Sequence, residues 1–405
     1  MARVVRLILV DGDGAPLGAL PDVDIEDPWW PEVGDIVTVA RERFGVDLFV
    51  LRLVDAQGGE GMTGGFVSYT AEATGPTPPL VSAPEDLPYE EDPRRAPWAR
   101  PGGVASIVAW ADEALRERGT PRIGPEHQVK TWNLSSVLQL PTAHGVVWCK
   151  SVPRFFAHEP AVVSLLARER ASIVPGVVAA DEGLGSLLLE DLGPDVLWDA
   201  EEKTLTRMVR ALVALQVGWA DRTDDLLAIS TPDRRSPGLA EQLQSFLARG
   251  DVRATLRSDE LGALDDLAAD LPGLLATLAA CGIPDSLVHG DFHPGNWIRH
   301  DGELFLFDWG DSVVGHPLID TGFLAAIDDE DVRSRVRAAW LEAWRAAMPG
   351  SDPETAIDAI APIVALWKAF AYRAFLDAIE PSEHRYHERD VPDWLRVALD
   401  AHAPA

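Results

Sequence analysis

The sequence predicts an α+β fold in which a small α/β unit precedes a β-rich segment and a longer helical segment. Short apolar runs bounded by turn residues, which are typical of strands, gather before about residue 190. Helical apolar spacing dominates after about residue 200, and a proline-rich stretch separates the first 75 residues from the rest. We therefore expect four parts, namely a small α/β N-terminal domain (1–75), a Pro-rich acidic linker (76–103), a β-rich part with a leading helix (104–193) and a helical part (194–405).

Composition excludes several classes of protein. The chain has 405 residues, 47% of them hydrophobic and 25% charged, as in an ordinary soluble globular protein. A net charge of −30 argues against a nucleic-acid partner, which would need a basic face, and gives no support for docking on an anionic membrane. Two cysteines, Cys149 and Cys281, are too few for a disulfide framework, and Cys149 is expected to be a buried free thiol. No signal peptide is recognisable and no run approaches the roughly 18 apolar residues of a membrane span, so we expect a cytoplasmic protein.

The N-terminal part alternates strand and helix signals. The glycine cluster at 58–65 lacks the Gly-Lys-Ser/Thr ending of a phosphate-binding loop and no helix follows it, so a hairpin loop is expected there. The proline-rich linker that follows is expected to be extended and poor at forming a core. The predicted elements of the N-terminal part are strands at Val4–Val10, Leu48–Val54 and Gly65–Tyr69 and a helix at Pro31–Phe44 that Gly45 ends.

The rest of the chain divides into strands followed by helices. A helix at Val104–Arg118 leads into strands at Gln128–Trp132, Val137–Leu140, Val146–Cys149, Val177–Ala180 and Leu187–Glu190. Apolar spacing then predicts helices at Ala200–Trp219, Leu239–Arg249, Ser258–Cys281, Val332–Met348, Ala356–Ile379 and Val391–Ala401.

One stretch, residues 287–310 (LVHGDFHPGNWIRHDGELFLFDWG), combines the residues that phosphoryl transfer needs. Asp291 is followed five positions later by Asn296, and a short apolar strand at Leu304–Phe307 ends in Asp308. An acid, an amide at this spacing and a second acid at the end of a strand can orient a hydroxyl nucleophile and hold magnesium against a nucleotide's phosphates. His-Gly-Asp alone is a common turn, but the joint pattern rarely arises by accident.

The motifs HGDFHPGN and DWG resemble those of the aminoglycoside phosphotransferase-like branch of the protein-kinase-like fold, whose members phosphorylate hydroxyls of small molecules. The resemblance implies a bilobal fold, with a β-rich small lobe at 104–193 and a helical large lobe at 194–405. It implies ATP or GTP as co-substrate, Mg²⁺ as cofactor, and a small-molecule acceptor such as an aminoglycoside or other antibiotic, a sugar, an amino sugar or an amino alcohol. The acceptor, the choice of nucleotide, the role of the N-terminal domain and the oligomeric state stay open.

The resemblance also assigns roles in the catalytic loop. Asp291 would accept or orient the proton of the acceptor hydroxyl, and Asn296 and Asp308 would hold magnesium. His289 and Asp320 are expected to steady the loop.

In the small lobe, the resemblance makes Lys150 the strand lysine that binds the α- and β-phosphates, with Glu159 as its helix partner and Glu169 as the rival. The alternative for Lys150 is a solvated strand end. Ser135 and Ser136 lie where the phosphate-covering loop belongs, although that turn is not glycine-rich and is equally well explained as a plain β-turn. The backbone at Glu190–Leu192 would meet the adenine edge.

A nucleotide-binding pseudokinase or regulatory scaffold is the alternative function. The intact Asp291, Asn296, Asp308 and Lys150 count against it, whereas the unusual phosphate loop and the appended N-terminal unit support it. Four further regions are open to two interpretations. Asp311 and His316 either face the acceptor or are exposed polar residues. The pair Tyr372-Arg373 and the run 383–388 could line an acceptor pocket, although a polar surface segment is expected for the run.

Overall fold

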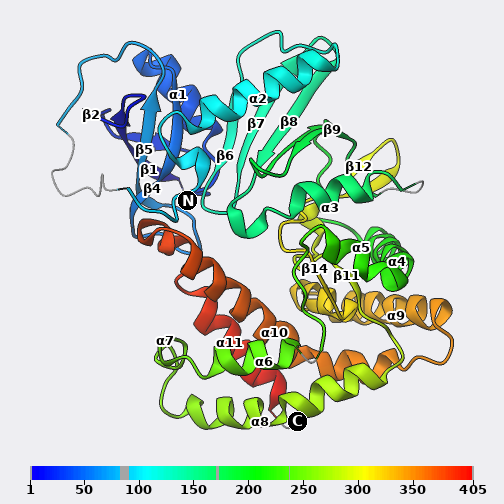
Figure 1. The fold of residues 1–405 in the computed structure, drawn as a ribbon. Coiled ribbons are helices and arrows are strands. Elements are labelled where there is room, and N and C mark those ends of the chain that lie inside the picture. The colour runs from blue at the N-terminus through cyan, green and yellow to red at the C-terminus, as the bar shows by residue number, and fades with distance from the viewer. Residues whose placement is uncertain (1, 83–90, 170–172, 237, 404–405) are drawn as a thin grey trace. The chain divides into compact units, whose positions relative to one another are not determined.

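The computed structural model describes residues 2–82, 91–169, 173–236 and 238–403 (Figure 1). The chain forms two compact units, which we call the sheet unit and the helical unit. The sheet unit comprises Met1–Pro160, Gly176–Asp191 and Phe375–Glu388, and the helical unit comprises Ala161–Pro175, Leu192–Ala374 and Arg389–Ala405. These two units do not coincide with the four segments that the sequence predicts. The boundaries of those segments stay predictions.

The N-terminal part of the sheet unit is a mixed five-stranded sheet. Its strands run in the order β2-β1-β5-β4, with β3 also paired to β1 and with β1 and β5 parallel. The expected strands and helix are present, whereas β2 and β3, of four and three residues, were not predicted because such short runs carry no periodicity. The elements are β1 (Arg3–Val10), β2 (Pro16–Ala19), β3 (Val23–Ile25), α1 (Gly34–Phe44), β4 (Leu48–Gln57) and β5 (Gly65–Ala73).

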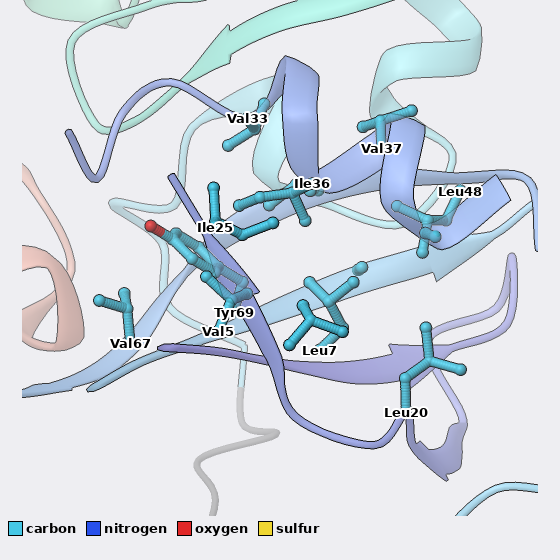
Figure 2. Packing of buried hydrophobic residues seen from close by; sticks show 14 of the residues in the cluster. Val5, Leu7, Leu20, Ile25, Val33, Ile36, Val37, Leu48, Val67 and Tyr69 are labelled. Atoms are coloured by element: carbon cyan, nitrogen blue, oxygen red, sulfur yellow. The ribbon is translucent and has the colours of Figure 1, made fainter. Parts of the chain in front are cut away.

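Helix α1 covers one face of this sheet and encloses an apolar core (Figure 2). Ile36 and Val37 of α1 belong to the same cluster as Val5 and Tyr69 of the strands, and Ile36, Val5 and Tyr69 are fully buried. Gly45 ends the helix as predicted, with a φ of 69° and its N–H bonded to the carbonyls of Ala40 and Arg41. The glycine cluster at 58–65 is the loop of the β4–β5 hairpin.

A second sheet in this unit is wholly antiparallel, with the order β6-β7-β8-β10-β9. Helix α2 packs on it, and its residues Ile107 and Leu115 share a core with Leu138, Cys149 and Leu188 of the strands. Cys149 is a buried free thiol, as expected. The elements are α2 (Gly103–Glu117), β6 (His127–Thr131), β7 (Ser136–Thr142), β8 (Gly145–Ser151), β9 (Val177–Asp181) and β10 (Ser186–Glu190).

The second half of the proline-rich segment contributes to the core, and the expectation that it would not is wrong. Trp98, in the short 3₁₀ helix η1 (Pro97–Ala99), is 1% exposed and packs in one cluster with Phe49 and Leu51 of β4. Its indole N–H donates to the carbonyl of Trp132 at 3.2 Å. A single large aromatic side chain outweighs the extended tendency of the surrounding prolines.

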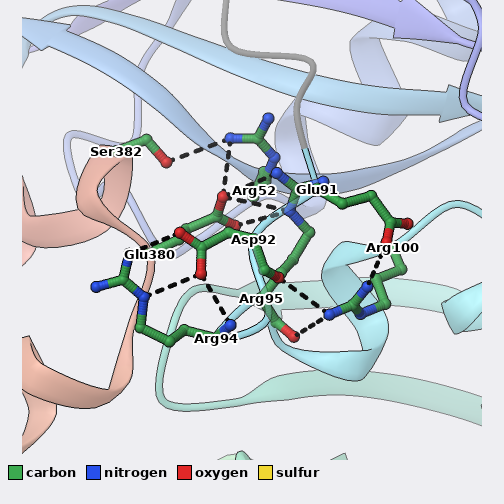
Figure 3. A network of polar contacts seen from close by, with 8 residues as sticks. All are labelled: Arg52, Glu91, Asp92, Arg94, Arg95, Arg100, Glu380 and Ser382. Carbon is green, nitrogen blue, oxygen red and sulfur yellow. Dashed lines mark hydrogen bonds and ion pairs between the residues drawn. The ribbon is translucent and has the colours of Figure 1, made fainter.

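The segment Phe375–Glu388 joins the sheet unit through buried charges (Figure 3). Glu380 lies 3.4 Å from Arg52 and 3.0 Å from Arg95, and the side chains of all three are at most 7% exposed. The prediction of an exposed polar run at 383–388 is therefore wrong for Glu383, Tyr386 and His387, which are 2%, 4% and 2% exposed. Tyr386 belongs to the core of the N-terminal sheet, which explains why a polar-looking segment is buried.

The helical unit is built mainly from long helices, as the apolar spacing predicts, and it contains two small two-stranded sheets. Strands β11 and β14 pair antiparallel, as do β12 and β13. The strands are β11 (Ser286–Val288), β12 (Trp297–His300), β13 (Glu303–Leu306) and β14 (Val313–Gly315). The helices are α4 (Glu202–Trp219), α5 (Thr223–Ala228), α6 (Gly238–Leu247), α7 (Gly250–Arg253), α8 (Glu260–Ala280), α9 (Glu330–Ala347), α10 (Pro353–Ala378) and α11 (Asp390–His402). The short helix α3 (Glu159–Leu166) begins in the sheet unit.

Helix α10 is long and apolar enough to cross a membrane by length and composition alone, contrary to the expectation that no segment would be. However, 56% of its most apolar 18-residue window is buried inside the protein. Burial of this extent is what a core helix of a globular protein shows.

Glu383, whose carboxyl group is buried close to the charges of Glu380 and Arg52, predicts a pH-dependent contribution to stability. Burial, followed by the negative charge of Glu380, raises the pKa of Glu383 to about 8, against the opposing effect of Arg52 and Arg95. Between the unfolded pKa of about 4.3 and this value, the folded protein keeps a proton that the unfolded chain has lost. The free energy of unfolding therefore falls as pH rises through this window, by up to about 1.4 kcal/mol per pH unit from this group.

Glu383→Gln should flatten this pH dependence, because the amide cannot ionise. Urea unfolding of the wild-type protein and the variant at several pH values between about 5 and 8 measures the difference in slope. Glu388→Gln is the matched control, since the Glu388 side chain is 47% exposed in the same segment. Equal slopes for Glu383→Gln and the wild-type protein would show that Glu383 is ionised in the folded state.

Candidate active site

A buried carboxylate holds the start of the catalytic loop, residues 289–296, which follows β11. Asp320, in the 3₁₀ segment η5 (Pro317–Ala326), is 3% exposed and accepts the amides of His289 at 2.9 Å and Gly290 at 2.8 Å. Gln216 of α4 donates to the same carboxylate at 2.9 Å. Gly290 has a φ of 83°, and a Cβ there would overlap the carbonyl of Asp311, so only glycine fits this turn. Asp320 thus steadies the loop, as its sequence position suggests.

His289 connects the catalytic loop to the strand before Asp308. Its side chain is fully buried, and this burial lowers the pKa of His289 to about 4, so the ring is neutral at neutral pH. Nε2 lies 3.0 Å from the carbonyl of Phe307, and Nδ1 lies 3.3 Å from the amide of Asp291. A neutral ring satisfies both contacts in one tautomer, with Nε2–H donating to Phe307 and Nδ1 accepting from Asp291.

The carboxylate of Asp291 is held from three directions and remains accessible. Oδ1 accepts from Nζ of Lys368 at 2.8 Å, and Oδ2 lies 3.3 Å from Nδ2 of Asn296 and 3.4 Å from Nε2 of His293. Loss of hydration raises the pKa of Asp291, but Lys368 and His293 lower it by more, so the pKa lies well below its usual range. With 38% of the side chain exposed, Asp291 is an ionised carboxylate that solvent can reach.

Asn296 and Asp308 lie at the same end of the β12–β13 hairpin. Nδ2 of Asn296 donates to the carbonyl of Asp291 at 2.9 Å, which leaves the amide oxygen as the end suited to a cation. The amide of Phe307 donates to the carbonyl of Asn296 at 3.0 Å, so the two segments are joined one residue before Asp308. Asp308 is exposed and has a φ of 64°, an uncommon conformation for a residue other than glycine and one found at functional sites.

The donor set of this site suits magnesium better than a tightly caged metal. Among the residues that the structure describes, no group of three or more His, Cys, Asp or Glu side chains is arranged to hold a metal ion. Magnesium is commonly bound through one or two protein oxygens together with water and substrate phosphates. The amide oxygen of Asn296 and the carboxylate of Asp308 fit that pattern.

Trp309, which follows Asp308, is a core residue. It is fully buried, its indole N–H donates to the carbonyl of Leu306 at 3.1 Å, and it meets the ring of His289 edge-on at 4.6 Å between centroids.

An exposed tryptophan lies against the other side of the loop. Trp198 is 69% exposed, and its ring stacks on that of His293 with 5.3 Å between centroids and 27° between planes. A Cβ on Gly295 would overlap the indole, so the glycine permits this close approach. The segment before Trp198 is fixed by a hydrogen bond of 2.9 Å from the amide of Leu197 to the carbonyl of Trp297.

In the sheet unit, Lys150 pairs with Glu159. Nζ of Lys150 lies 2.6 Å from Oε1 of Glu159, with the two side chains 13% and 1% exposed, whereas Glu169 binds Arg222 at 2.7 Å. Of the two candidates, the structure thus brings Glu159 to the strand lysine. A solvated strand end would not be buried in this way.

The predicted phosphate-covering turn, residues 132–136, is partly buried. Ser135 and Ser136 are 8% and 2% exposed, and the Ser135 hydroxyl accepts from the indole N–H of Trp132 at 2.9 Å. The side chain of Asn133 contacts the carbonyl of Glu383 at 3.3 Å and Nε2 of His387 at 3.0 Å. The segment Phe375–Glu388 therefore holds this turn in place. A phosphate contact from Ser135 or Ser136 stays a prediction.

At the expected hinge, the amide of Glu190 donates to the carbonyl of Gly176 at 2.9 Å. The carbonyl of Leu192 lies 3.0 Å from Nδ1 of His300. An adenine contact at these two residues stays a prediction.

The interpretation of His316 as an exposed polar residue is wrong. It is 8% exposed, its Nδ1 accepts from the amide of Leu318 at 3.4 Å, and burial lowers its pKa to about 4. The ring caps the start of η5, and this capping role explains its burial.

Sequence reasoning missed Lys368 and Trp198. Lys368 is a lone cation in the apolar stretch IVALWKAFAY, and a lysine at such a position requires an anionic partner. That signal was available in the sequence, although it does not say which acid is the partner. Trp198 carries no comparable signal in the sequence, because its packing against the loop is possible only where residue 295 is a glycine.

Comparison with known proteins gives a consistent result. A sequence model described as the phosphotransferase enzyme family matches residues 128–354, more than half of the chain. No protein of curated function matches in sequence.

Solved structures show the fold. A choline/ethanolamine kinase family protein from Mesorhizobium loti is 16% identical, with 73% of this chain and 98% of that chain covered and a TM-score of 0.50. A choline kinase from Streptococcus pneumoniae is 12% identical, with coverage of 73% and 99% and a TM-score of 0.50. An ethanolamine kinase from Plasmodium vivax is 11% identical, with coverage of 73% and 88% and a TM-score of 0.50. The predicted α+β, kinase-like fold class is confirmed.

The packing of Trp198 on Gly295 predicts a coupled pair of substitutions. Gly295→Ala should lower the free energy of unfolding by about 1–3 kcal/mol, because the new methyl group overlaps the indole. Trp198→Ala, at an exposed position, should cost less than about 1 kcal/mol alone and should relieve the overlap in the double variant. Urea unfolding of the four proteins measures the coupling. Gly218→Ala is the control, since nothing lies within 4 Å of its added Cβ, and additive effects would contradict the stacked geometry.

Proposed function

Because the chain belongs to the phosphotransferase enzyme family, we propose that it transfers the γ-phosphate of ATP, or of GTP, to a hydroxyl group of a small molecule. The observation that carries this proposal is the partly exposed Asp291 carboxylate. It is held beside Asn296, and Asn296 and Asp308 lie at the same end of the β12–β13 hairpin. Family membership makes the chain a small-molecule kinase and supports the resemblance of its HGDFHPGN motif. We propose a cytoplasmic location.

The acceptor belongs to a range of hydroxyl compounds. An aminoglycoside or other antibiotic, a sugar, an amino sugar and an amino alcohol all present the required nucleophile. The similar proteins from Mesorhizobium loti and Streptococcus pneumoniae are named as choline kinases or their relatives, which supports including amino alcohols.

In the proposed reaction, Asp291 accepts a hydrogen bond from the acceptor hydroxyl and directs its oxygen at the γ-phosphorus. The new O–P bond forms as the bond to the nucleoside diphosphate breaks, and the hydroxyl proton passes to Asp291 or to solvent. Because its pKa is held low, Asp291 is a weak base, so its main contribution is orientation.

The proposed nucleotide contacts are the ones that the family resemblance assigns. Asn296 and Asp308 would hold magnesium through oxygen, and the ion would neutralise phosphate charge when bound. Lys150, fixed by Glu159, would contact the non-transferred phosphates. Further nucleotide contacts would come from Ser135, Ser136 and the backbone of Glu190 and Leu192.

A nucleotide-binding pseudokinase is the second candidate. The burial of the 132–136 turn against the C-terminal segment favours it, because that turn offers no glycine-rich loop to phosphate. A thermal-shift screen with magnesium nucleotides and a library of hydroxyl compounds, followed by assay of nucleoside diphosphate release, separates the two candidates.

Asp291→Asn should reduce turnover by about 10²–10⁴-fold, because the neutral amide orients the acceptor hydroxyl less strongly than the carboxylate and cannot take up its proton. Nucleotide affinity, measured by calorimetry, should stay within about twofold, since Asp291 orients the acceptor and does not bind the metal. Asp301→Asn is the matched control, because Asp301 lies in the β12–β13 turn and its side chain is 93% exposed. Near-normal turnover of Asp291→Asn on an identified acceptor would remove Asp291 from the mechanism.

Asp308→Ala should instead weaken binding of the magnesium nucleotide. In this variant, nucleotide affinity with magnesium should fall to the value measured with a chelator, because the carboxylate that ties the ion to the protein is gone. Calorimetric titration with and without magnesium tests this directly. An unchanged gain in affinity from magnesium would show that the ion is held elsewhere.

A further inference from the structure

Lys368 reaches the proposed catalytic aspartate from a part of the chain that the motif does not include. It lies on α10, 77 positions from Asp291. Its Nζ donates to Oδ1 of Asp291 at 2.8 Å and to the carbonyl of Gly290 at 2.9 Å. The side chain is 19% exposed, so this is a largely enclosed ion pair.

The position on α10 is otherwise that of a core residue. Leu366, Trp367 and Ala369 around it are 0%, 4% and 0% exposed. Removing an ammonium group from water at such a site is costly unless a negative partner compensates for it. Apolar residues in place of both members of such a pair are often as stable or more stable, so stability alone does not explain why this pair is present.

The surrounding charges keep Lys368 protonated. Burial lowers the pKa of Lys368, but Asp291, followed by Asp311 and Asp320, raises it by more. These acids come from the catalytic loop, from the turn after Asp308 and from η5. The ammonium therefore presents a fixed positive charge to Oδ1 throughout the neutral range.

The two contacts of Lys368 form a clamp on one dipeptide. One hydrogen bond fixes the backbone at Gly290 and the other fixes the side chain of Asp291, which limits rotation of the carboxylate about its side-chain bonds. The other oxygen, Oδ2, then faces Asn296 and His293. Without Lys368, Oδ1 loses its charged partner and these two contacts alone would hold the carboxylate.

We propose that Lys368 is a positioning residue of the phosphoryl-transfer reaction, which holds the Asp291 carboxylate in the single orientation that receives the acceptor hydroxyl. The inference rests on the proposed function, because it needs Asp291 to act on the acceptor. Misplacement of a reacting group by about 1 Å costs on the order of 10²-fold in rate, which sets the size of the expected effect.

Lys368→Met tests the role, since methionine fills a similar volume without the charge. We expect kcat to fall about 10–100-fold with KM for nucleotide and acceptor within about threefold, because orientation is lost and binding is kept. Lys368→Arg, which keeps the charge, should recover part of this loss. Lys203→Met, at an exposed lysine on α4, is the matched control and should leave kcat unchanged.

The double variant with Asp291→Asn shows whether Lys368 acts through Asp291. If it does, adding Lys368→Met to Asp291→Asn should change the residual kcat by less than about threefold. Equal losses in both backgrounds would overturn the proposal, as would a Lys368→Met enzyme with kcat within about twofold of the wild type. Thermal unfolding checks that each variant is folded, and Lys368→Gln replaces Lys368→Met if the latter is not.

The same variants distinguish a failure of the proposed function from a failure of the role of Lys368. An inert Asp291→Asn substitution on an identified acceptor contradicts the proposed function itself. A severe loss in Asp291→Asn with none in Lys368→Met contradicts only the role of Lys368.

Discussion

The catalytic loop depends on one buried carboxylate that pairs with its backbone. Asp320 accepts hydrogen bonds from the amides of His289 and Gly290, which would otherwise be buried donors without acceptors beside Asp291. From there a continuous set of contacts runs through the His289 ring to Phe307, and from Phe307 back to Asn296. The positions of the amide and the two acids are therefore fixed together, so a disturbance at Asp320 would reach all of them.

The electrostatics of the loop follow from this burial. His289 is neutral because it is enclosed, so it orients its neighbours without adding a cation. Asp291 is ionised because Lys368 and His293 outweigh its loss of hydration. Asp308 and Asp311 add further negative charge nearby in sequence, which is an environment that favours a divalent cation bound with an anionic nucleotide.

Sequence patterns predicted the elements with long periodicity and the residues of the local motif. The longer helices and the central strands were found because each repeats its apolar positions over several turns or pleats, and the HGDFHPGN motif lies within a few residues. The short strands β2 and β3 carry no such repeat.

Contacts between residues far apart in sequence could not be predicted from the sequence. Nothing local links Lys368 to Asp291, Glu380 to Arg52, or Asn133 to the carbonyl of Glu383, because each pair is joined only by the fold. The same limit explains the wrong surface assignment of residues 383–388. Acidic and aromatic side chains look solvated until their buried partners are known.

The membership of Phe375–Glu388 in the sheet unit has a consequence for synthesis of the chain. The sheet core receives Tyr386, and Arg52 and Arg95 receive Glu380, from a segment that is translated long after them, since Glu380 follows Arg95 by 285 positions. Until then, Arg52 and Arg95, which are buried in the folded protein, lack their carboxylate partner, and the N-terminal sheet lacks part of its packing. The N-terminal sheet therefore completes its packing only after this distant segment has been made, and contacts between residues so far apart in sequence are typical of slow folding.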